Sequence, residues 1–322
     1  MVETILSSSR QFHCNDVCIE ALHWRIQGRE PSRKILCIHG WLDNAASFNL
    51  LAPKLVALGY EVLAIDFAGN GKSSHRALHG YYNLWDDLID IRAILQELDW
   101  NDYALLGHSR GAAVASLYAS TQPAGLACLV LLDGILPPED EVSALPDQLQ
   151  AFLEDRDRAV AKTESLKPVM AVDEQSEPIS ARGCMRSMEE AWRKRNGTYH
   201  LELEELAPLL ERGMRICGRE RDGTPCYRWS HDQRWLSRSL YRLSNSDRAQ
   251  VLDSIAVPTF LLAAANGRVG AVEKDSKLQI YDACKTLEFD THEGVHHFHM
   301  QRKHVDSIAA RLDQWLRNLN SV

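Results

Sequence analysis

The sequence predicts an α/β protein with a mostly parallel β-sheet and helices on both of its faces. Short apolar runs of strand length alternate with segments whose apolar residues recur at helical spacing, in residues 1–135 and again in residues 254–322. Such strand–helix–strand units form right-handed crossovers, which make the sheet parallel. The alternation stops in residues 136–253, which predicts a second, inserted unit.

The elements of the two alternating regions can be placed in order. Residues Asp16 to Gly28 alternate apolar and polar side chains, which is typical of an opening β-hairpin. Strands are then expected at Ile35–Ile38, Glu61–Asp66, Tyr103–Leu106 and Cys128–Leu132, with helices at Ser47–Leu58, Leu84–Leu98 and Ala112–Ala119. After the insertion, we expect a strand at Thr259–Ala264, a helix near Lys274–Cys284, a strand at Thr286–Phe289 and a helix at Val305–Leu319.

The inserted residues 136–253 are charged and mainly helical in pattern. Helices are expected at Leu145–Val160, Met185–Arg195 and Leu201–Arg212, and one short β-like piece at Tyr227–Trp229. An insertion that leaves from the carboxyl end of a parallel strand lies over the ligand crevice. We therefore expect a mainly helical cap over a core formed by residues 1–135 and 254–322.

Composition limits the class of protein and of partner. The 322 residues are 45% hydrophobic and 25% charged, as in an ordinary globular enzyme. A net charge of −8 without a long basic run argues against a nucleic-acid partner and an anionic membrane surface. No apolar run approaches the roughly 20 residues that span a bilayer. The start lacks the apolar core of a secretory signal and the eight cysteines are scattered, so a cytoplasmic, reduced protein is expected.

The strongest motif is a Gly-x-Ser-x-Gly pattern, Gly107-His108-Ser109-Arg110-Gly111. A strand-like run precedes it and a helix-compatible run of small residues follows it. Strand, sharp turn and helix form the context of a nucleophile elbow, in which the serine hydroxyl stands at the carboxyl end of the sheet. The motif therefore predicts that Ser109 is a catalytic nucleophile.

Together with other segments, this elbow resembles the α/β-hydrolase family. His39-Gly40-Trp41 is similar to the oxyanion-hole turn of the family, and Asp66 to Ser74 is similar to its glycine-rich loop. Gly294-Val295-His296 resembles the segment that brings in the catalytic histidine. Within the family, the sequence is most similar to the serine-hydrolase-like proteins, whose physiological substrates are undefined.

The resemblance implies the roles of several residues. His296 would be the general base for Ser109, with His292, His297, His299 and His304 as rivals in sequence. The main-chain N–H groups of Trp41 and Arg110 would form the oxyanion hole. The cluster of histidines near residue 296 lacks a second ligand set at metal spacing, so we expect no metal and no cofactor.

The acid of the expected triad departs from the usual family pattern. Most members place a carboxylate after the strand that precedes the histidine, but Asn266-Gly267-Arg268 stands there. Some members take the acid from the end of the strand after the nucleophile, where Asp133 lies, 24 residues after Ser109. Asp133 is the first candidate, Glu273 and Asp275 are alternatives, and a site without an acid is a further one.

The resulting prediction is a serine hydrolase that cleaves a carboxylic ester of a small to medium, partly apolar molecule. A thioesterase, a carbon–carbon hydrolase and a cofactor-free peroxidase would use the same residues. A hydrolase-fold binding protein with little turnover is the alternative outside catalysis. Labelling with a fluorophosphonate separates an enzyme from such a binding protein, because only an activated serine is labelled.

Overall fold

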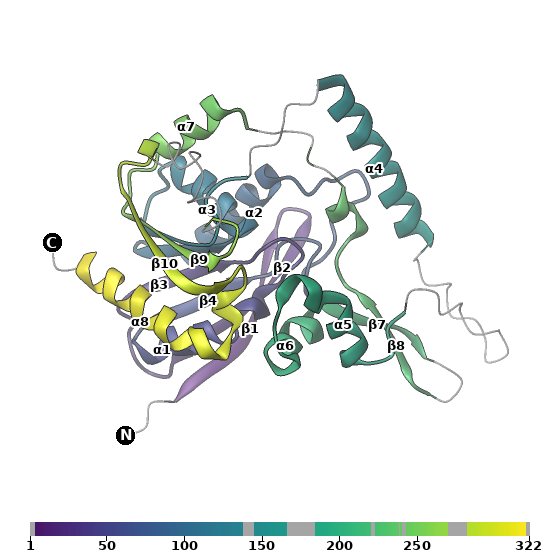
Figure 1. Ribbon diagram of the computed structural model, residues 1–322, viewed down its shortest axis with the longest axis horizontal. Coiled ribbons are helices and arrows are strands. Elements are labelled where there is room, and N and C mark those ends of the chain that lie inside the picture. The colour runs from purple at the N-terminus through teal and green to yellow at the C-terminus, as the bar shows by residue number, and fades with distance from the viewer. Residues whose placement is uncertain are drawn as a thin grey trace.

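The computed structural model describes residues 4–137, 145–165, 184–219, 223–237, 239, 243–269 and 282–319. Its centre is an eight-stranded sheet with the strand order β1-β2-β4-β3-β5-β6-β9-β10 (Figure 1). The strands are β1 (Ile5–Cys14), β2 (Val17–Ile26), β3 (Lys34–Ile38), β4 (Glu61–Ile65), β5 (Tyr103–His108), β6 (Leu126–Leu132), β9 (Thr259–Asn266) and β10 (Leu287–Val295). β1 and β2 pair antiparallel, as do β2 and β4, and every pair from β4 to β10 is parallel. The mostly parallel sheet of the prediction is confirmed.

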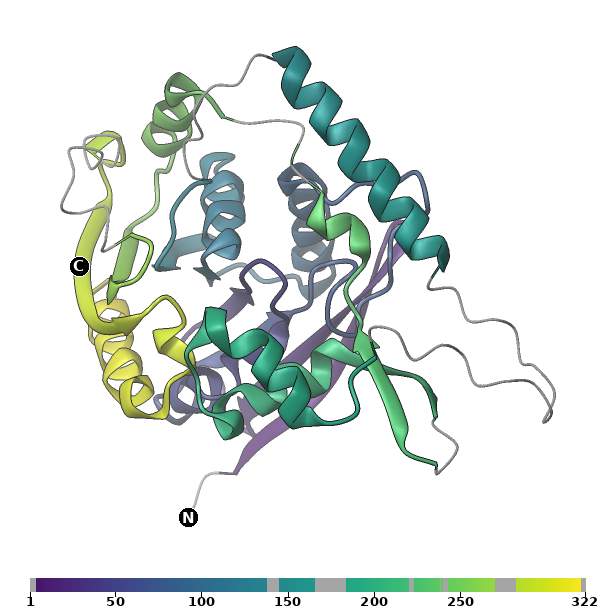
Figure 2. The same ribbon diagram turned by 45° about the vertical axis from the view of Figure 1, so that its right-hand side comes forward.

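Helices cover both faces of this sheet (Figures 1 and 2). They are α1 (Leu51–Ala57) and α8 (Arg302–Leu319) on one face, and α2 (Leu84–Leu98), α3 (Arg110–Ser120) and α7 (Asn245–Asp253) on the other. The strands alternate between two apolar clusters, as the pleat requires. In β3, Leu36 and Ile38 pack toward α2 and α3, whereas Ile35 and Cys37 pack toward α1 and α8. The helices therefore bury both faces of the parallel strands.

The opening hairpin begins earlier in the chain than expected. Residues 16–28 form mainly its second strand, while the first strand is β1, and the turn lies at Asn15, whose φ is 53°. The predicted bounds were wrong because β1 is largely exposed and carries the polar run Ser7-Ser8-Ser9. A strand with so little apolar surface gives almost no hydrophobic signal.

Other bounds differ by a few residues. The helix expected at 47–58 is a 3₁₀ turn, η1 (Ala45–Phe48), followed by α1. The helix expected near 274–284 falls mainly outside the described residues. The remaining strands and helices of the two alternating regions lie within a few residues of their expected positions.

The inserted segment holds α4 (Leu145–Ser165), α5 (Met188–Tyr199), α6 (Leu203–Gly213) and a separate two-stranded sheet, β7 (Met214–Arg219) and β8 (Pro225–Trp229), followed by the 3₁₀ turn η2 (Gln233–Leu236). β7 was not expected, because none of its residues is buried and it lacks an apolar run. Helices α5 and α6 lie beside the β7–β8 hairpin, and α4 lies apart from them (Figure 2). A small apolar cluster that includes Leu206, Leu210 and Tyr199 joins α5 and α6.

A buried ion pair ties the inserted segment to the main sheet. Arg212, near the end of α6, donates from Nε to both carboxylate oxygens of Asp66, the residue that follows β4, at 2.9 Å each. Asp66 also accepts the backbone N–H groups of Ala45 and Lys72. Both charged side chains are almost inaccessible to solvent. The end of β4, two loops and α6 are therefore held together by one carboxylate.

Within the described residues, no helix combines the length and the apolar character needed to cross a membrane.

Candidate active site

The turn between β5 and α3 holds Ser109 in a strained conformation. Its φ is 54° and its ψ is −116°, a region that costs a non-glycine residue roughly 1–3 kcal/mol. The turn needs glycine on both sides. A Cβ on Gly107 would lie 2.5 Å from the Gly111 carbonyl oxygen, and a Cβ on Gly111 would lie 2.1 Å from the Ile38 carbonyl oxygen. These close approaches place the serine hydroxyl at the carboxyl end of the sheet.

A hydrogen-bonded chain connects this serine to a histidine and a carboxylate. Nε2 of His296 lies 2.8 Å from Oγ of Ser109, and its Nδ1 lies 2.5 Å from Oδ2 of Asp133. His296 follows β10, and Asp133 follows β6, so the three side chains come from three separate strand ends. With Nδ1 protonated toward Asp133, the lone pair of Nε2 faces the serine hydroxyl.

The loop after β9 is shaped to receive Asp133. Besides His296, the carboxylate accepts the backbone N–H groups of Ala264, Arg268 and Val269. A Cβ on Gly267 would lie 2.3 Å from Oδ2 of Asp133, so only glycine leaves room for the carboxylate. The loop Asn266-Gly267-Arg268, which lacks the usual acid, therefore binds the carboxylate of an acid that follows the neighbouring strand.

Burial and neighbouring charges set the protonation states of this pair. Burial lowers the pKa of His296 below its ordinary 6.5, and the nearby His108 and Arg268 act in the same direction, while the hydrogen bond to Asp133 opposes them. Burial alone would raise the pKa of Asp133, but its hydrogen bonds and the charge of His296 keep that pKa below the usual value. At neutral pH the histidine is therefore neutral and the aspartate ionised, as a general base and its orienting partner require.

The two residues expected to form the oxyanion hole come from the turn after β3, which holds Trp41, and from the first position of α3, which is Arg110. Arg110 is the first residue of α3, where backbone N–H groups have no partner within the helix. Its guanidinium pairs with Asp87 at 2.6 Å, so only its main chain is free to serve the site. No backbone–backbone hydrogen bond among the described residues uses the N–H of Trp41, and its indole Nε1–H donates to the Trp235 carbonyl.

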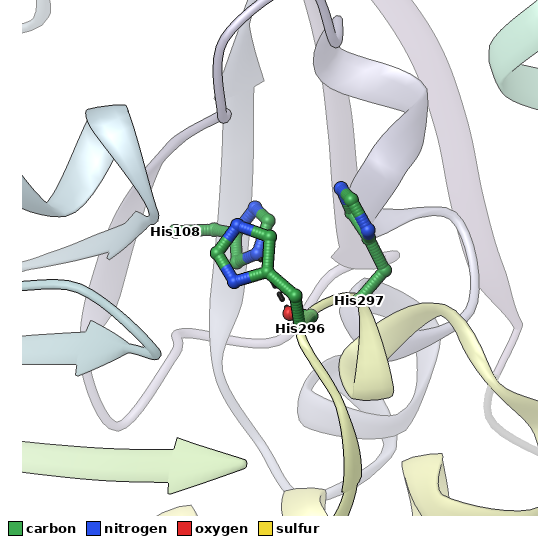
Figure 3. A group of neighbouring side chains, drawn as sticks. All are labelled: His108, His296 and His297. Atoms are coloured by element: carbon green, nitrogen blue, oxygen red, sulfur yellow. Dashed lines mark hydrogen bonds between the residues drawn. The ribbon is translucent and has the colours of Figure 1, made fainter. Parts of the chain in front are cut away.

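Three other histidines pack around His296 and organise its loop. Nε2–H of His108 donates to the His296 carbonyl oxygen at 3.0 Å (Figure 3). His297 stacks on Tyr199 with ring centroids 4.1 Å apart. His299 is fully buried. Ligand atoms of His108, His296 and His297 lie within 4.8 Å of one another, which is close enough for a metal ion. However, both ring nitrogens of His296 already face Asp133 and Ser109, so an ion there would take the base away from the serine.

The comparison with protein families decides the class of this site. Residues 34–205, more than half of the chain, match the model of the alpha/beta hydrolase fold. The chain belongs to the α/β-hydrolase family.

Relatives of this hydrolase point to one subgroup. It is 31% identical to serine hydrolase-like protein 2 of Homo sapiens over 85% of this chain and 84% of the relative. It is 28% identical to a serine hydrolase-like protein of Dictyostelium discoideum, over 85% of this chain and 72% of that one. Both matches support the predicted similarity to the serine-hydrolase-like proteins, and thus a hydrolase.

Solved structures agree with the fold of the hydrolase. A hypothetical protein of Pseudomonas aeruginosa PAO1 superposes with a TM-score of 0.74 at 28% identity, over 96% of this chain and 99% of that chain. A thioesterase domain from the curacin biosynthetic pathway superposes with a TM-score of 0.71 at 25% identity, over 96% and 99%.

Of the residues predicted for the site, the structure brings Ser109, His296 and Asp133 into one hydrogen-bonded chain, and Trp41 and Ser109 line one cavity. Glu273 and Asp275 lie outside the described residues.

The cavity has a volume of about 540 Å³ and lies between the main sheet and the inserted segment. It is the space in which a substrate of this hydrolase would meet Ser109.

Sequence reasoning missed a buried carboxylate behind the site. Asp43 accepts the hydroxyl of Tyr199, and its other oxygen lies 3.6 Å from Nδ1 of His108. Burial would raise the pKa of Asp43, but His108 and His297 outweigh it and hold that pKa far below the usual value. The only signal in the sequence is its place in the turn after His39-Gly40-Trp41. Its partners come from β5, α5 and the His296 loop, which only the folded chain brings together.

Proposed function

We propose that this chain is a serine hydrolase that cleaves a carboxylic ester through an acyl-enzyme. The observation that carries the proposal is the hydrogen-bonded chain from Asp133 through His296 to Ser109. In a member of the α/β-hydrolase family, that order of acid, base and serine at three strand ends is the arrangement that activates a hydroxyl for acyl transfer.

Each residue has a defined task in this mechanism. His296 accepts the proton of Ser109 as Oγ attacks the ester carbonyl carbon, and it then gives that proton to the leaving alcohol. Asp133 keeps Nδ1 of His296 protonated and stabilises the imidazolium. The main-chain N–H groups of Trp41 and Arg110 hold the oxyanion of the tetrahedral intermediate. Water, activated by His296, then hydrolyses the acyl-enzyme and restores the serine.

The inserted residues 136–253, apart from α7, which packs on the main sheet, act in this proposal as a cap over a core of residues 1–135 and 254–322. The supporting observation is the cavity itself, whose lining includes Ser109 from the sheet and Trp229 from the inserted hairpin. A pocket closed from both sides limits water and selects the substrate by shape. The ligand in this reading is a small molecule that fits a cavity of about 540 Å³.

A thioester is the second candidate substrate. The superposition on a solved thioesterase domain at a TM-score of 0.71 favours it over carbon–carbon bond cleavage or peroxidase chemistry. The same residues would act in the same order, with a thiol instead of an alcohol as the leaving group.

The test is fluorophosphonate labelling combined with turnover of p-nitrophenyl butyrate. We expect the unmodified protein to be labelled and Ser109→Ala to lose both labelling and roughly 10⁴–10⁶ of its kcat. Ser120→Ala is the matched control, because Ser120 ends the same helix and its hydroxyl bonds only the Leu117 carbonyl. A protein that is not labelled and does not turn over esters is a binding protein, and full activity of Ser109→Ala would refute the mechanism.

A further inference from the structure

The cavity over Ser109 is strongly basic, although the whole chain has a net charge of −8. Its described lining includes six basic side chains, Lys162, Lys194, Arg195, Arg215, Arg228 and Arg268. Two carboxylates are part of the same lining, and both have partners. Asp43 accepts the Tyr199 hydroxyl, and Asp232 pairs with Arg234. Lys194 pairs with Glu190, whereas none of the ion pairs among the described residues includes Arg195, Arg215, Arg228 or Arg268. These four arginines therefore supply positive charge without a matching anion in the protein.

Two of these arginines stand side by side on the inserted hairpin. Arg215 of β7 and Arg228 of β8 are directly opposite each other in the antiparallel register. Like charges at opposed positions destabilise a strand pair. Among the described residues, none of the ion pairs includes either guanidinium, and Nε of Arg228 is buried without a hydrogen-bond partner. The two opposed arginines weaken the hairpin, and one of their N–H donors has no partner. An anion bound between the two guanidinium groups would remove both costs.

A third arginine and a neutral histidine belong to the same cavity wall. Arg195 lies over the ring of Trp229 at 4.4 Å and donates to the Leu42 carbonyl oxygen, so it is fixed in place. Burial, with the positive charges of Arg195 and Lys162, lowers the pKa of His231 to about 3. His231 therefore stays neutral in the cavity wall, and the wall keeps its fixed arginine charge across the pH range of enzyme activity.

Resting on the proposed hydrolase function, we infer that the substrate carries an oxyanion group, a carboxylate or a phosphate, which Arg215 and Arg228 bind while Ser109 attacks its ester or thioester carbonyl. A guanidinium presents a planar fork of donors that matches the oxygens of either anion. At the half-buried Arg228 the attraction is less screened than at an open surface. The arginine pair thus acts as a specificity site, separate from the groups that carry out acyl transfer.

Two matched substrate pairs test the inference and separate the possible positions of the anion. The first pair is p-nitrophenyl hexanoate and the p-nitrophenyl monoester of adipic acid, which differ by a carboxylate at the far end of the same six-carbon acyl chain. The second pair is S-butyryl-pantetheine and S-butyryl-4′-phosphopantetheine, which differ by one phosphate on the leaving group. For each pair, the ratio of kcat/KM for the anionic and the neutral member is measured.

We expect the anionic member of at least one pair to be preferred by roughly tenfold or more, because hydrogen bonds to charged groups are about twice as strong as neutral ones. Arg215→Gln and Arg228→Gln should each reduce that ratio by about tenfold. Arg219→Gln is the control: Arg219 is exposed on the same strand, donates to the Gly223 carbonyl oxygen and does not line the cavity. It should leave the ratio unchanged.

A second measurement does not depend on the variants folding. In the unmodified protein, raising potassium chloride from about 20 to about 500 mM should shrink the preference for the anionic substrate, because salt screens the attraction. Equal kcat/KM within both pairs would overturn the inference, and so would a preference that both arginine variants retain. These outcomes leave the proposed function standing as long as Ser109→Ala abolishes turnover of the neutral ester. If Ser109→Ala keeps that turnover, the proposed function fails instead.

Discussion

Replacing Asp133 by asparagine should remove most of the activity, and the size of the loss follows from its hydrogen bonds. Oδ1 accepts the N–H groups of Ala264 and Val269, both at 3.2 Å. Oδ2 accepts the N–H of Arg268 at 2.7 Å and Nδ1–H of His296 at 2.5 Å. In Asp133→Asn, one oxygen becomes an NH₂ donor, and either orientation of the amide sets it against at least one existing donor.

The two orientations are not equally good. An NH₂ group in place of Oδ1 would face two backbone N–H groups, neither of which can change. An NH₂ group in place of Oδ2 would face only the Arg268 N–H, because the ring of His296 can shift its proton and accept at Nδ1. We expect the second orientation. The proton then sits on Nε2 and faces Ser109, so the histidine cannot act as a base, a change that costs about 10⁴ in kcat in a serine protease.

The assay is kcat for p-nitrophenyl butyrate under saturating substrate, with the melting temperature as a control for folding. One opposed buried donor should lower stability by about 1–3 kcal/mol, which the melting curve will register without loss of the fold. Glu273→Gln and Asp275→Asn serve as parallel variants, because these carboxylates compete for the same role, and both should retain activity. A loss of less than tenfold in Asp133→Asn, or a steep loss in either parallel variant, would show that the acid is not Asp133.

Two further changes probe the same site from different sides. Gly267→Ala would place a Cβ 2.3 Å from the Asp133 carboxylate and should lower kcat by about 10²-fold. Gly197→Ala, whose Cβ would meet nothing within 4 Å, should leave kcat unchanged. Equal kcat in the two variants would refute the requirement for glycine beside Asp133. Because burial lowers the pKa of His296, kcat/KM should fall with decreasing pH only below 6.5. Arg268→Gln removes a positive charge that also lowers this pKa, so in this variant the fall of kcat/KM at acid pH should begin at a higher pH. A pH profile of kcat/KM that stays unchanged would contradict the effect of Arg268 on the pKa of His296.

The sequence predicted the parts of the fold that depend on local patterns. Ser109 was found because its turn sits between an apolar strand and a helix of small residues, and that context is visible in one stretch of chain. Asp133 was found because it ends a buried strand. β1 and β7 were missed for the opposite reason, since neither has a continuous run of buried apolar residues, and tertiary pairing rather than an apolar pattern makes them strands.

The lining of the cavity was beyond sequence reasoning. Arg195, Arg215, Arg228 and Arg268 come from a helix, two strands and a loop that are spread over more than seventy residues. In sequence each is one of many charged residues, and no spacing groups them. The expectation of a partly apolar substrate was made without the lining residues, because the charge of the pocket depends on which side chains the fold turns inward.

The ion pair between Asp66 and Arg212 has a consequence for how fast a substrate can arrive. Swinging α6 away from the sheet would separate two buried charges, which costs about 3–5 kcal/mol. At 1.4 kcal/mol per factor of ten, an open form would be populated at roughly 10⁻² to 10⁻⁴. If the substrate could bind only to this open form, the association rate constant would fall from a typical 10⁵–10⁷ M⁻¹s⁻¹ by the same factor. Fast capture therefore requires entry through the existing opening of the cavity. Trp41, which lines it, is 49% exposed and can move by breaking only its indole hydrogen bond to the Trp235 carbonyl, with no ion pair broken.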